Sequence, residues 1–216
     1  MPDDVNANGV PGSASGTDEF EFEDGVQLSK DCKQNIARAV SNILATVGVN
    51  ADPEGIRDTP KRVANMYDEL LEGYALDAKA LLNNALFDVQ YDEMVVVKDI
   101  DFYSLCEHHM LPFYGQAHVG YLPDKRVVGL SKIPRLVDMF AKRLQVQERM
   151  TQQIASAIDE LVMPKGVGVV VEAHHLCAAM RGVKKPGTMM TTSSVRGQFR
   201  DNPSTREEFM AHLKGR

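Results

Sequence analysis

Two short clusters of cysteine and histidine constrain this chain most, because each follows directly on a stretch that is typical of a β-strand. The first is LCEHHMLPF at residues 105–113, and the second is HHLC at residues 174–177, after the β-branched run 167–172. Reactive polar side chains are costly to bury without partners. Strand ends of one sheet can converge in space while lying far apart in sequence. We therefore expect the fold to bring the two clusters together.

The residue types in these clusters are those that bind zinc. Cys106 and His109 form a C-x-x-H motif, and Cys177 lies in the second cluster; thiolate and imidazole are natural zinc ligands. Five of the six histidines fall within residues 108–118 and 174–175, which a random scatter would not produce. Three protein ligands leave one position for water, so His108 and His175 remain available for acid–base chemistry.

Two other interpretations of the clusters stay open at this point. They could hold buried thiols beside ordinary core histidines, since free cysteine is often buried. They could also close a structural zinc site, with one further histidine as the fourth ligand. For Cys32, which lies on a helical pattern with no histidine nearby, the buried-thiol interpretation is preferred, and His118 is interpreted as a structural residue.

The periodicity of apolar residues indicates a mixed architecture in three regions. Residues 1–28 are predicted to be a disordered acidic tail, 29–93 an N-terminal helical region, and 94–216 the catalytic region. Strands and helices do not alternate strictly, which favours an α+β fold with an antiparallel sheet. We predict helices over 30–47 and 59–71, a helix from Pro134 to Leu144, and helices over 150–161 and from Pro203; strands are predicted over 94–100, 116–122 and 167–172, with an extended segment over 188–199.

The distribution of charge along the chain limits the kinds of ligand or partner that it is expected to bind. The net charge is −6, but the tail carries seven acidic residues and no lysine or arginine, so residues 30–216 are at about +1. A local basic pocket there suits a small anionic ligand better than nucleic acid, which needs a broad basic face. We expect no membrane span and no secretory signal. The three widely spaced cysteines do not form a disulfide framework, and a cytoplasmic location is expected.

Several basic residues are placed where an anion could bind. Lys132 and Arg135 flank the start of the helix predicted at Pro134, where a positive charge is unfavourable unless an anion is present. Arg181 follows Cys177 closely, and Arg62 lies on the second predicted helix. Each alone is typical of a solvated surface charge. Together with the metal clusters they indicate a phosphate pocket.

The segment QVQER at residues 145–149 interrupts the apolar pattern between two predicted helices. A carboxylate such as Glu148 can accept two N–H groups from a guanine edge, and the neighbouring amide of Gln147 can complement it. A polar turn between helices is the alternative interpretation.

With these residues identified, the sequence closely resembles the GTP cyclohydrolase I family over about residues 30–213. The resemblance rests on several long motifs in order, with a looser match at TPKRVANMY (59–67). The close matches are CEHHMLPFYG (106–115), GLSKIPRLV (129–137), QVQER (145–149), VVVEAHHLCAAMRGV (169–183) and TTSSVRGQF (191–199).

The resemblance implies a fold, an assembly and a reaction. The fold would be the tunnelling fold, in which antiparallel sheets of several subunits close a barrel. The assembly would be a homodecamer of two pentamers with active sites at subunit interfaces. The reaction would convert GTP and water into 7,8-dihydroneopterin triphosphate and formate, the first step of folate and pterin biosynthesis.

The resemblance also implies roles for individual residues. Cys106, His109 and Cys177 match the zinc ligands, and His108 and His175 match histidines that move protons. The remaining matches concern the nucleotide: Ser131 near the ribose, Glu148 and Gln147 at the base, and Lys132, Arg135, Arg181 and Arg62 at the triphosphate, with Arg62 supplied by a neighbouring subunit.

Two alternative functions follow from the same residues. One is another tunnelling-fold purine or pterin enzyme, such as the nitrile reductase of queuosine synthesis, which would need a free nucleophilic cysteine and a reduced nicotinamide. The other is a non-catalytic nucleotide-binding module whose zinc site is closed by four protein ligands.

Overall fold

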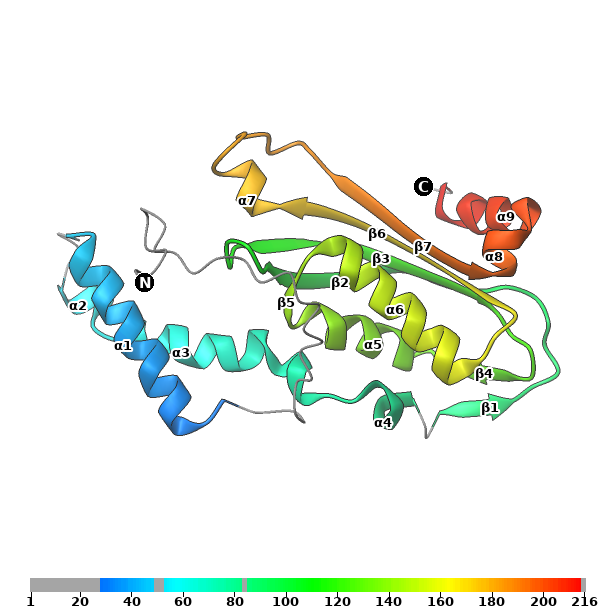
Figure 1. Ribbon diagram of the computed structural model, residues 1–216, viewed down its shortest axis with the longest axis horizontal. Helices are drawn as coiled ribbons and strands as arrows, with labels where there is room; N and C mark the ends of the chain where they lie inside the picture. The colour runs from blue at the N-terminus through cyan, green and yellow to red at the C-terminus, as the bar shows by residue number, and fades with distance from the viewer. Residues whose placement is uncertain (1–27, 49–52, 83–84, 215–216) are drawn as a thin grey trace, which may run out of the picture.

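A five-stranded sheet forms the centre of the molecule in this computed structural model, which describes residues 28–48, 53–82 and 85–214 (Figure 1). The strand order is β5-β2-β3-β6-β7, antiparallel except for the short β5, which runs parallel to β2. A separate two-stranded sheet pairs β1 with β4. The strands are β1 (Leu86–Asp88), β2 (Val95–Cys106), β3 (Pro112–Leu122), β4 (Arg126–Val128), β5 (Leu144–Gln145), β6 (Gly166–His175) and β7 (Met190–Gly197).

Helices cover one face of this sheet and part of the other, so the predicted α+β class is confirmed. Figure 1 shows α5 and α6 along one face, α8 and α9 at one end of the opposite face, and α1 to α3 projecting to the side. The helices are α1 (Lys30–Thr46), α2 (Pro53–Ile56), α3 (Thr59–Leu70), the 3₁₀ turn η1 (Glu72–Ala75), α4 (Ala78–Leu82), α5 (Lys132–Ala141), α6 (Gln147–Val162), α7 (Leu176–Ala179), α8 (Gln198–Asp201) and α9 (Pro203–Lys214).

The main core lies between the sheet and helices α5 and α6. Phe113 and Val169 of the sheet and Val137 and Ile154 of the helices are fully buried there. Burial of such side chains is the dominant favourable term in folding. This layer fixes the positions of the strand ends that carry the cysteine and histidine clusters.

A second, smaller core packs the C-terminal helices onto the opposite face. Phe199 of α8 and Phe209 of α9 are fully buried and meet edge to face, with ring centroids 5.4 Å apart. They lie against Gly120 and Gly168, where a Cβ atom would approach a phenylalanine ring to 2.7 Å and 2.5 Å. Only glycine leaves room for these rings.

The predicted strand over 94–100 ended too early, because β2 continues to Cys106. Beyond the register shift between Val97 and Ile100, buried Phe102 alternates with exposed Tyr103. At the shift, Asp99 adopts a positive φ of 58°. The bulge and the polar residues around it broke the apolar run on which the prediction depended.

Two helix predictions need correction around α5 and α6. Helix α5 begins at Lys132 rather than at Pro134, which lies in the first turn, and Leu144 belongs to β5 rather than to the helix. The segment 145–149 is not a turn between helices, because Gln145 pairs with β2 and α6 starts at Gln147.

The N-terminal region packs loosely within the single chain. Helix α1 is capped by Ser29, whose hydroxyl accepts the backbone N–H of Cys32, and Lys33 of α1 contacts Asp68 of α3 at 2.6 Å. No residue of α1 is buried, and Cys32 is exposed, so the prediction of a buried thiol there was wrong. The region is not entirely helical, because β1 lies in it. The tail prediction falls almost wholly outside the described residues.

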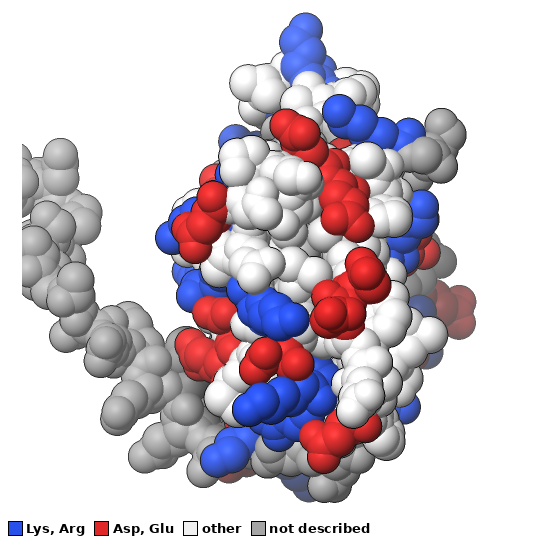
Figure 2. Space-filling model, turned by 90° about the vertical axis from the view of Figure 1, so that its right-hand side faces the viewer, with Lys and Arg blue, Asp and Glu red and all other residues white. Residues whose placement is uncertain are grey.

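None of the described helices is both long and apolar enough to cross a membrane. Figure 2 shows acidic and basic side chains interspersed on the side of the molecule that it presents.

Candidate functional site

The turn between β2 and β3 carries two of the predicted metal ligands. Strand β2 ends at Cys106, whose carbonyl oxygen accepts hydrogen bonds from the backbone N–H groups of His109 (3.3 Å) and Met110 (2.7 Å). Met110 adopts a positive φ of 53°, which lets the chain reverse within a few residues. This tight turn folds His109 back over Cys106.

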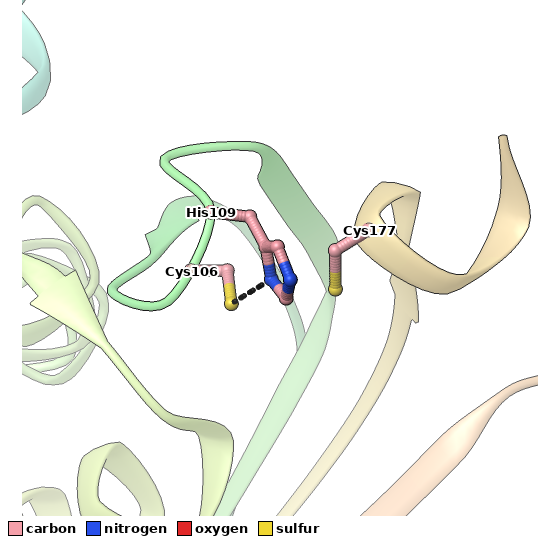
Figure 3. Close-up of side chains that lie close together, drawn as sticks. All are labelled: Cys106, His109 and Cys177. Atoms are coloured by element: carbon pink, nitrogen blue, oxygen red, sulfur yellow. Dashed lines mark hydrogen bonds between the residues drawn. The ribbon is translucent and has the colours of Figure 1, made fainter. Parts of the chain in front are cut away.

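The third predicted ligand arrives from the neighbouring strand. In the antiparallel pairing of β3 with β6, Phe113 lies opposite His175, so the end of β6 meets the β2–β3 turn. Cys177 follows in α7. Figure 3 shows the side chains of Cys106, His109 and Cys177 directed toward one another, and their ligand atoms all lie within 4.8 Å of each other.

The spacing and chemistry of this group suit a tetrahedral zinc ion. Cys106 Sγ lies 3.8 Å from His109 Nδ1, close to the roughly 3.6 Å that follows from zinc–sulfur and zinc–nitrogen bonds at a tetrahedral angle. Two thiols and one imidazole are a common zinc donor set. Cys106 is buried, Cys177 is half-buried and His109 is exposed. The group is therefore reachable from solvent on one side.

The two thiols influence each other strongly. Burial raises the pKa of the Cys177 thiol, the nearby Cys106 raises it further, and the positive charge of Arg181 acts in the opposite direction. Without a metal, the neutral form of the Cys177 thiol is favoured. Arg181, a predicted phosphate contact, is close enough for its charge to act on this thiol.

His108 lies at the rim of the group beside Glu107. Its side chain is exposed, with Nδ1 3.9 Å from Cys106 Sγ and Nε2 3.8 Å from a Glu107 carboxylate oxygen. The Glu107 carboxylate in turn pairs with Arg149 in the first turns of α6. Arg149 also donates to the Gln145 side chain and to the Leu144 carbonyl, both at 3.1 Å.

The sequence interpretation missed this pairing of Glu107 and Arg149. It ties the β2–β3 turn to α6, although the two residues are 42 positions apart. Both residues lie inside motifs that had been identified, yet each is a common surface type. Nothing in their local pattern indicated that they meet.

His175 is held more tightly than His108. Its ring stacks parallel on Phe113, with centroids 4.7 Å apart and planes 1° from parallel. Its Nε2 lies 2.8 Å from the side-chain oxygen of Gln147. Burial lowers the pKa of His175; the Glu148 carboxylate opposes that shift, and His174 reinforces it.

Glu148 stands in the first turn of α6 with an exposed side chain, next to buried Gln147. An acidic residue there is favoured by the helix dipole. Its charge raises the pKa of His175, against the effect of burial. The predicted base contact is therefore within electrostatic range of the predicted proton carrier.

The structure does not bring the other predicted nucleotide contacts to this group within one chain. Lys132 and Arg135 are at the start of α5, whose far end leads to β5 beside Cys106. A helix of 10 residues spans about 15 Å. Lys132 and Arg135 line a separate cavity of about 610 Å³ with Glu72, Asp138 and Lys142.

Ser131 and Arg62 contribute no ligand atom to the metal group in the described part of the chain. Ser131 is exposed and directly precedes α5. Arg62 is exposed on α3 and lies 4.0 Å from Asp58. His118, interpreted as structural, is buried in β3, where its Nδ1 accepts the backbone N–H of Asp99 at 3.1 Å.

The fold and site together define an α+β protein with a Cys₂His group, suited to a metal ion, where a β-hairpin turn meets a short helix. The family model described as GTP cyclohydrolase I matches residues 36–214, and the chain belongs to this family.

Curated relatives agree along most of the chain. A protein of Campylobacter jejuni named GTP cyclohydrolase 1 is 56% identical over 80% of this chain and 90% of its own length. Proteins of the same name are 48% identical in Chlorobium phaeovibrioides, over 97% of this chain and 95% of theirs, and 50% identical in Deinococcus radiodurans, over 88% of each.

Among solved structures, the apo form of the archaeosine synthase QueF-Like aligns with 48% of this chain and 93% of its own, at 19% identity and a TM-score of 0.39. A likeness at that level carries no argument about this protein.

Proposed function

We propose that this protein is a cytoplasmic GTP cyclohydrolase that converts GTP and water into 7,8-dihydroneopterin triphosphate and formate, the first step of folate and pterin biosynthesis. The observation that carries the proposal is the convergence of Cys106, His109 and Cys177 beside His175 and Glu148. It occurs in a chain that belongs to the GTP cyclohydrolase I family.

Zinc is the proposed metal, held by Cys106, His109 and Cys177. When bound, zinc supplies a Lewis acid that lowers the pKa of a water molecule toward neutrality. Three protein ligands leave one position for that water. The exposure of His109 supports access from the solvent side.

His108 and His175 are the proposed proton carriers during opening of the imidazole ring of guanine. They flank the metal group from the β2–β3 turn and from the end of β6. The burial that lowers the pKa of His175 favours a neutral ring, which can take up a proton from water and deliver it to a leaving nitrogen.

Glu148 is the proposed reader of the base. Its exposed carboxylate can accept the N1–H and N2–H of guanine together, whereas adenine would place a lone pair against it. The effect of its charge on His175 supports a base held near the proton carrier. The resemblance also assigned Gln147 to the base, and its side chain is buried.

The triphosphate is proposed to contact Lys132, Arg135, Arg181 and Arg62, with Ser131 near the ribose. Arg181 lies beside the metal group, but the start of α5 is a helix length away. We therefore infer that a neighbouring subunit supplies Ser131, Lys132, Arg135 and Arg62. This requirement supports a homo-oligomer, which we propose to be a decamer. In it, residues 29–93 would act as an assembly region and residues 94–216 as the catalytic region.

The two alternative functions make different demands on the same group. A nitrile reductase needs a free nucleophilic cysteine, yet both cysteines near the site belong to the proposed zinc group. A closed zinc module needs a fourth protein ligand in place of water.

Incubation of the purified protein with GTP tests the proposal. We expect release of formate together with a pterin that becomes fluorescent after oxidation. A zinc-loaded protein that binds GTP and leaves it intact would favour the non-catalytic module instead.

A further inference from the structure

The side chain of Gln147 is buried, and both ends of its amide are in use. It is 1% exposed. Its Nε2 lies within hydrogen-bonding distance of the carbonyl oxygens of Val171 (2.9 Å) and Met190 (3.0 Å), and of the Thr192 hydroxyl (3.1 Å). The amide therefore links α6 to both β6 and β7.

These neighbours fix which way the amide points. Carbonyl oxygens can only accept hydrogen bonds, so the nitrogen of Gln147 must face Val171 and Met190. A flipped amide would set its oxygen against two carbonyl oxygens. The oxygen of Gln147 must consequently face the Nε2 of His175, at 2.8 Å.

This orientation determines the state of the imidazole of His175. An amide oxygen is an acceptor only, so Nε2 of His175 must carry a hydrogen and donate it. In a neutral ring the lone pair then lies on Nδ1. The parallel stack on the fully buried Phe113 fixes the plane of the ring, and Gln147 fixes its rotation within that plane.

We propose that Gln147 is a positioning residue that holds His175 in the Nε2–H form and aims its Nδ1 at the bound nucleotide. The inference rests on the proposed function and deepens it. It gives Gln147 a role different from the base contact assigned from sequence, because a base could reach its amide only by breaking the hydrogen bonds described above. A hydrogen-bond partner on one ring nitrogen orients an imidazole and selects its tautomer.

A double-mutant cycle distinguishes positioning through His175 from a general structural role. The variants are Gln147→Met, which keeps the shape and removes the amide, His175→Ala, and the two combined. We expect Gln147→Met to lower kcat about 10- to 100-fold, as loss of an orienting partner does elsewhere. In the His175→Ala background the same change should lower kcat by less than about threefold, because the residue through which it acts is absent.

One further variant serves as a matched control. Thr192→Val removes one acceptor of the Gln147 nitrogen and leaves its oxygen facing His175, so kcat should stay close to that of the wild type. Zinc content and the thermal unfolding midpoint, measured on every variant, identify any that fail to fold.

Two outcomes would overturn the inference: equal fold losses with and without His175, or a raised KM for GTP at unchanged kcat in Gln147→Met. The tautomer gives a readout that does not depend on turnover. In protein with ¹⁵N-labelled histidine, NMR should assign the proton of neutral His175 to Nε2, and Gln147→Met should weaken this preference. A proton on Nδ1 contradicts the inference, whereas a wild-type protein inert toward GTP contradicts the proposed function.

Discussion

Cys106, His109 and Cys177 are common residue types, and they become a candidate metal site because the fold brings their ligand atoms together at the end of the sheet. Burial and the neighbouring thiol both raise the pKa of Cys177, so a neutral Cys177 thiol is favoured in the metal-free group. A divalent cation reverses this preference, because it binds the thiolate form. Zinc binding should therefore release protons and stabilise the end of the sheet.

The first prediction concerns these ligands. Cys106→Ser and Cys177→Ser should each lose most of the bound zinc and the activity on GTP, because a hydroxyl is a much poorer zinc ligand than a thiolate. Metal analysis of the purified proteins measures this, with Cys32→Ser as the control, since Cys32 is exposed on α1 and outside the group. Full zinc occupancy with retained activity in either ligand variant would refute the assignment.

The second prediction concerns the base. Glu148→Gln keeps the shape of the side chain but replaces one acceptor by a donor, so it should cut kcat/KM for GTP by about 100-fold or more while zinc remains bound. Steady-state kinetics and metal content are measured on the same preparations. Values close to those of the wild type would mean that another group reads the base.

At the scale of helices and strands, the sequence predicted most elements and missed some of their ends. Periodic apolar residues located α1, α3 and α6, because packing on one face imposes a regular spacing, and a continuous β-branched run located β6. Polar residues around the bulge at Asp99 hid the second half of β2. The pairing of Leu144 and Gln145 with β2 depends on residues about 40 positions away, so no local pattern could indicate it.

For the candidate site too, the sequence predicted some features and could not predict others. Cys106, His109 and Cys177 were identifiable because metal binding restricts residue type and spacing. The contacts of Glu107 with Arg149 and of Gln147 with His175 were not, because each joins residues far apart in the chain. Such contacts are set by strand register and helix docking, which the local sequence does not specify.

The third prediction tests the packing of the C-terminal helices. Gly168→Ala would place a Cβ 2.5 Å from the ring of Phe199. Overpacking of this kind costs about 1–3 kcal/mol of the free energy of unfolding, measured by urea denaturation. Gly187→Ala is the control, since a Cβ there meets nothing within 4 Å. Equal stability of the two variants would contradict the tight fit of Phe199.

The fourth prediction concerns pH and the contact between α1 and α3. The hydrogen bond from Lys33 lowers the pKa of Asp68, the backbone N–H of Leu28 contributes in the same direction, and burial opposes them. Because the pKa of Asp68 is lower in the folded state, its carboxylate stabilises the fold above the ordinary aspartate pKa of about 4. This stabilisation is lost as the pH falls through the folded-state pKa.

Asp68→Asn should therefore unfold at a lower urea concentration than the wild type at pH 7, and this difference should shrink as the pH is lowered below about 4. Urea midpoints of both proteins across this pH range measure the effect. A difference that grows on acidification would contradict the assigned direction.

At the scale of the whole molecule, the single chain leaves much surface that an assembly could cover. Ile43 and Val47 of α1 are more than half exposed. In the part of the chain that the structure describes, β7 has no strand on its outer side, and β5 pairs with only the last residues of β2. These features support the proposed oligomer, in which neighbouring sheets continue one another.

The fifth prediction follows from this assembly and from the acidic tail. Light scattering should give a particle of about ten chains of 23.9 kDa each. Removal of residues 1–28 should change neither the assembly nor turnover, because the tail carries no apolar period to pack. A truncated protein that dissociates or becomes inactive would contradict the assignment of this segment.

The most direct test of the account is a zinc titration of the metal-free protein with product analysis. Formate and oxidised pterin are measured in the same samples after incubation with GTP. The account predicts equal amounts of the two products, rising in proportion to bound zinc and levelling off at one zinc per chain. Formation of both products at full rate without metal, or a zinc-loaded protein that releases neither product, would contradict it.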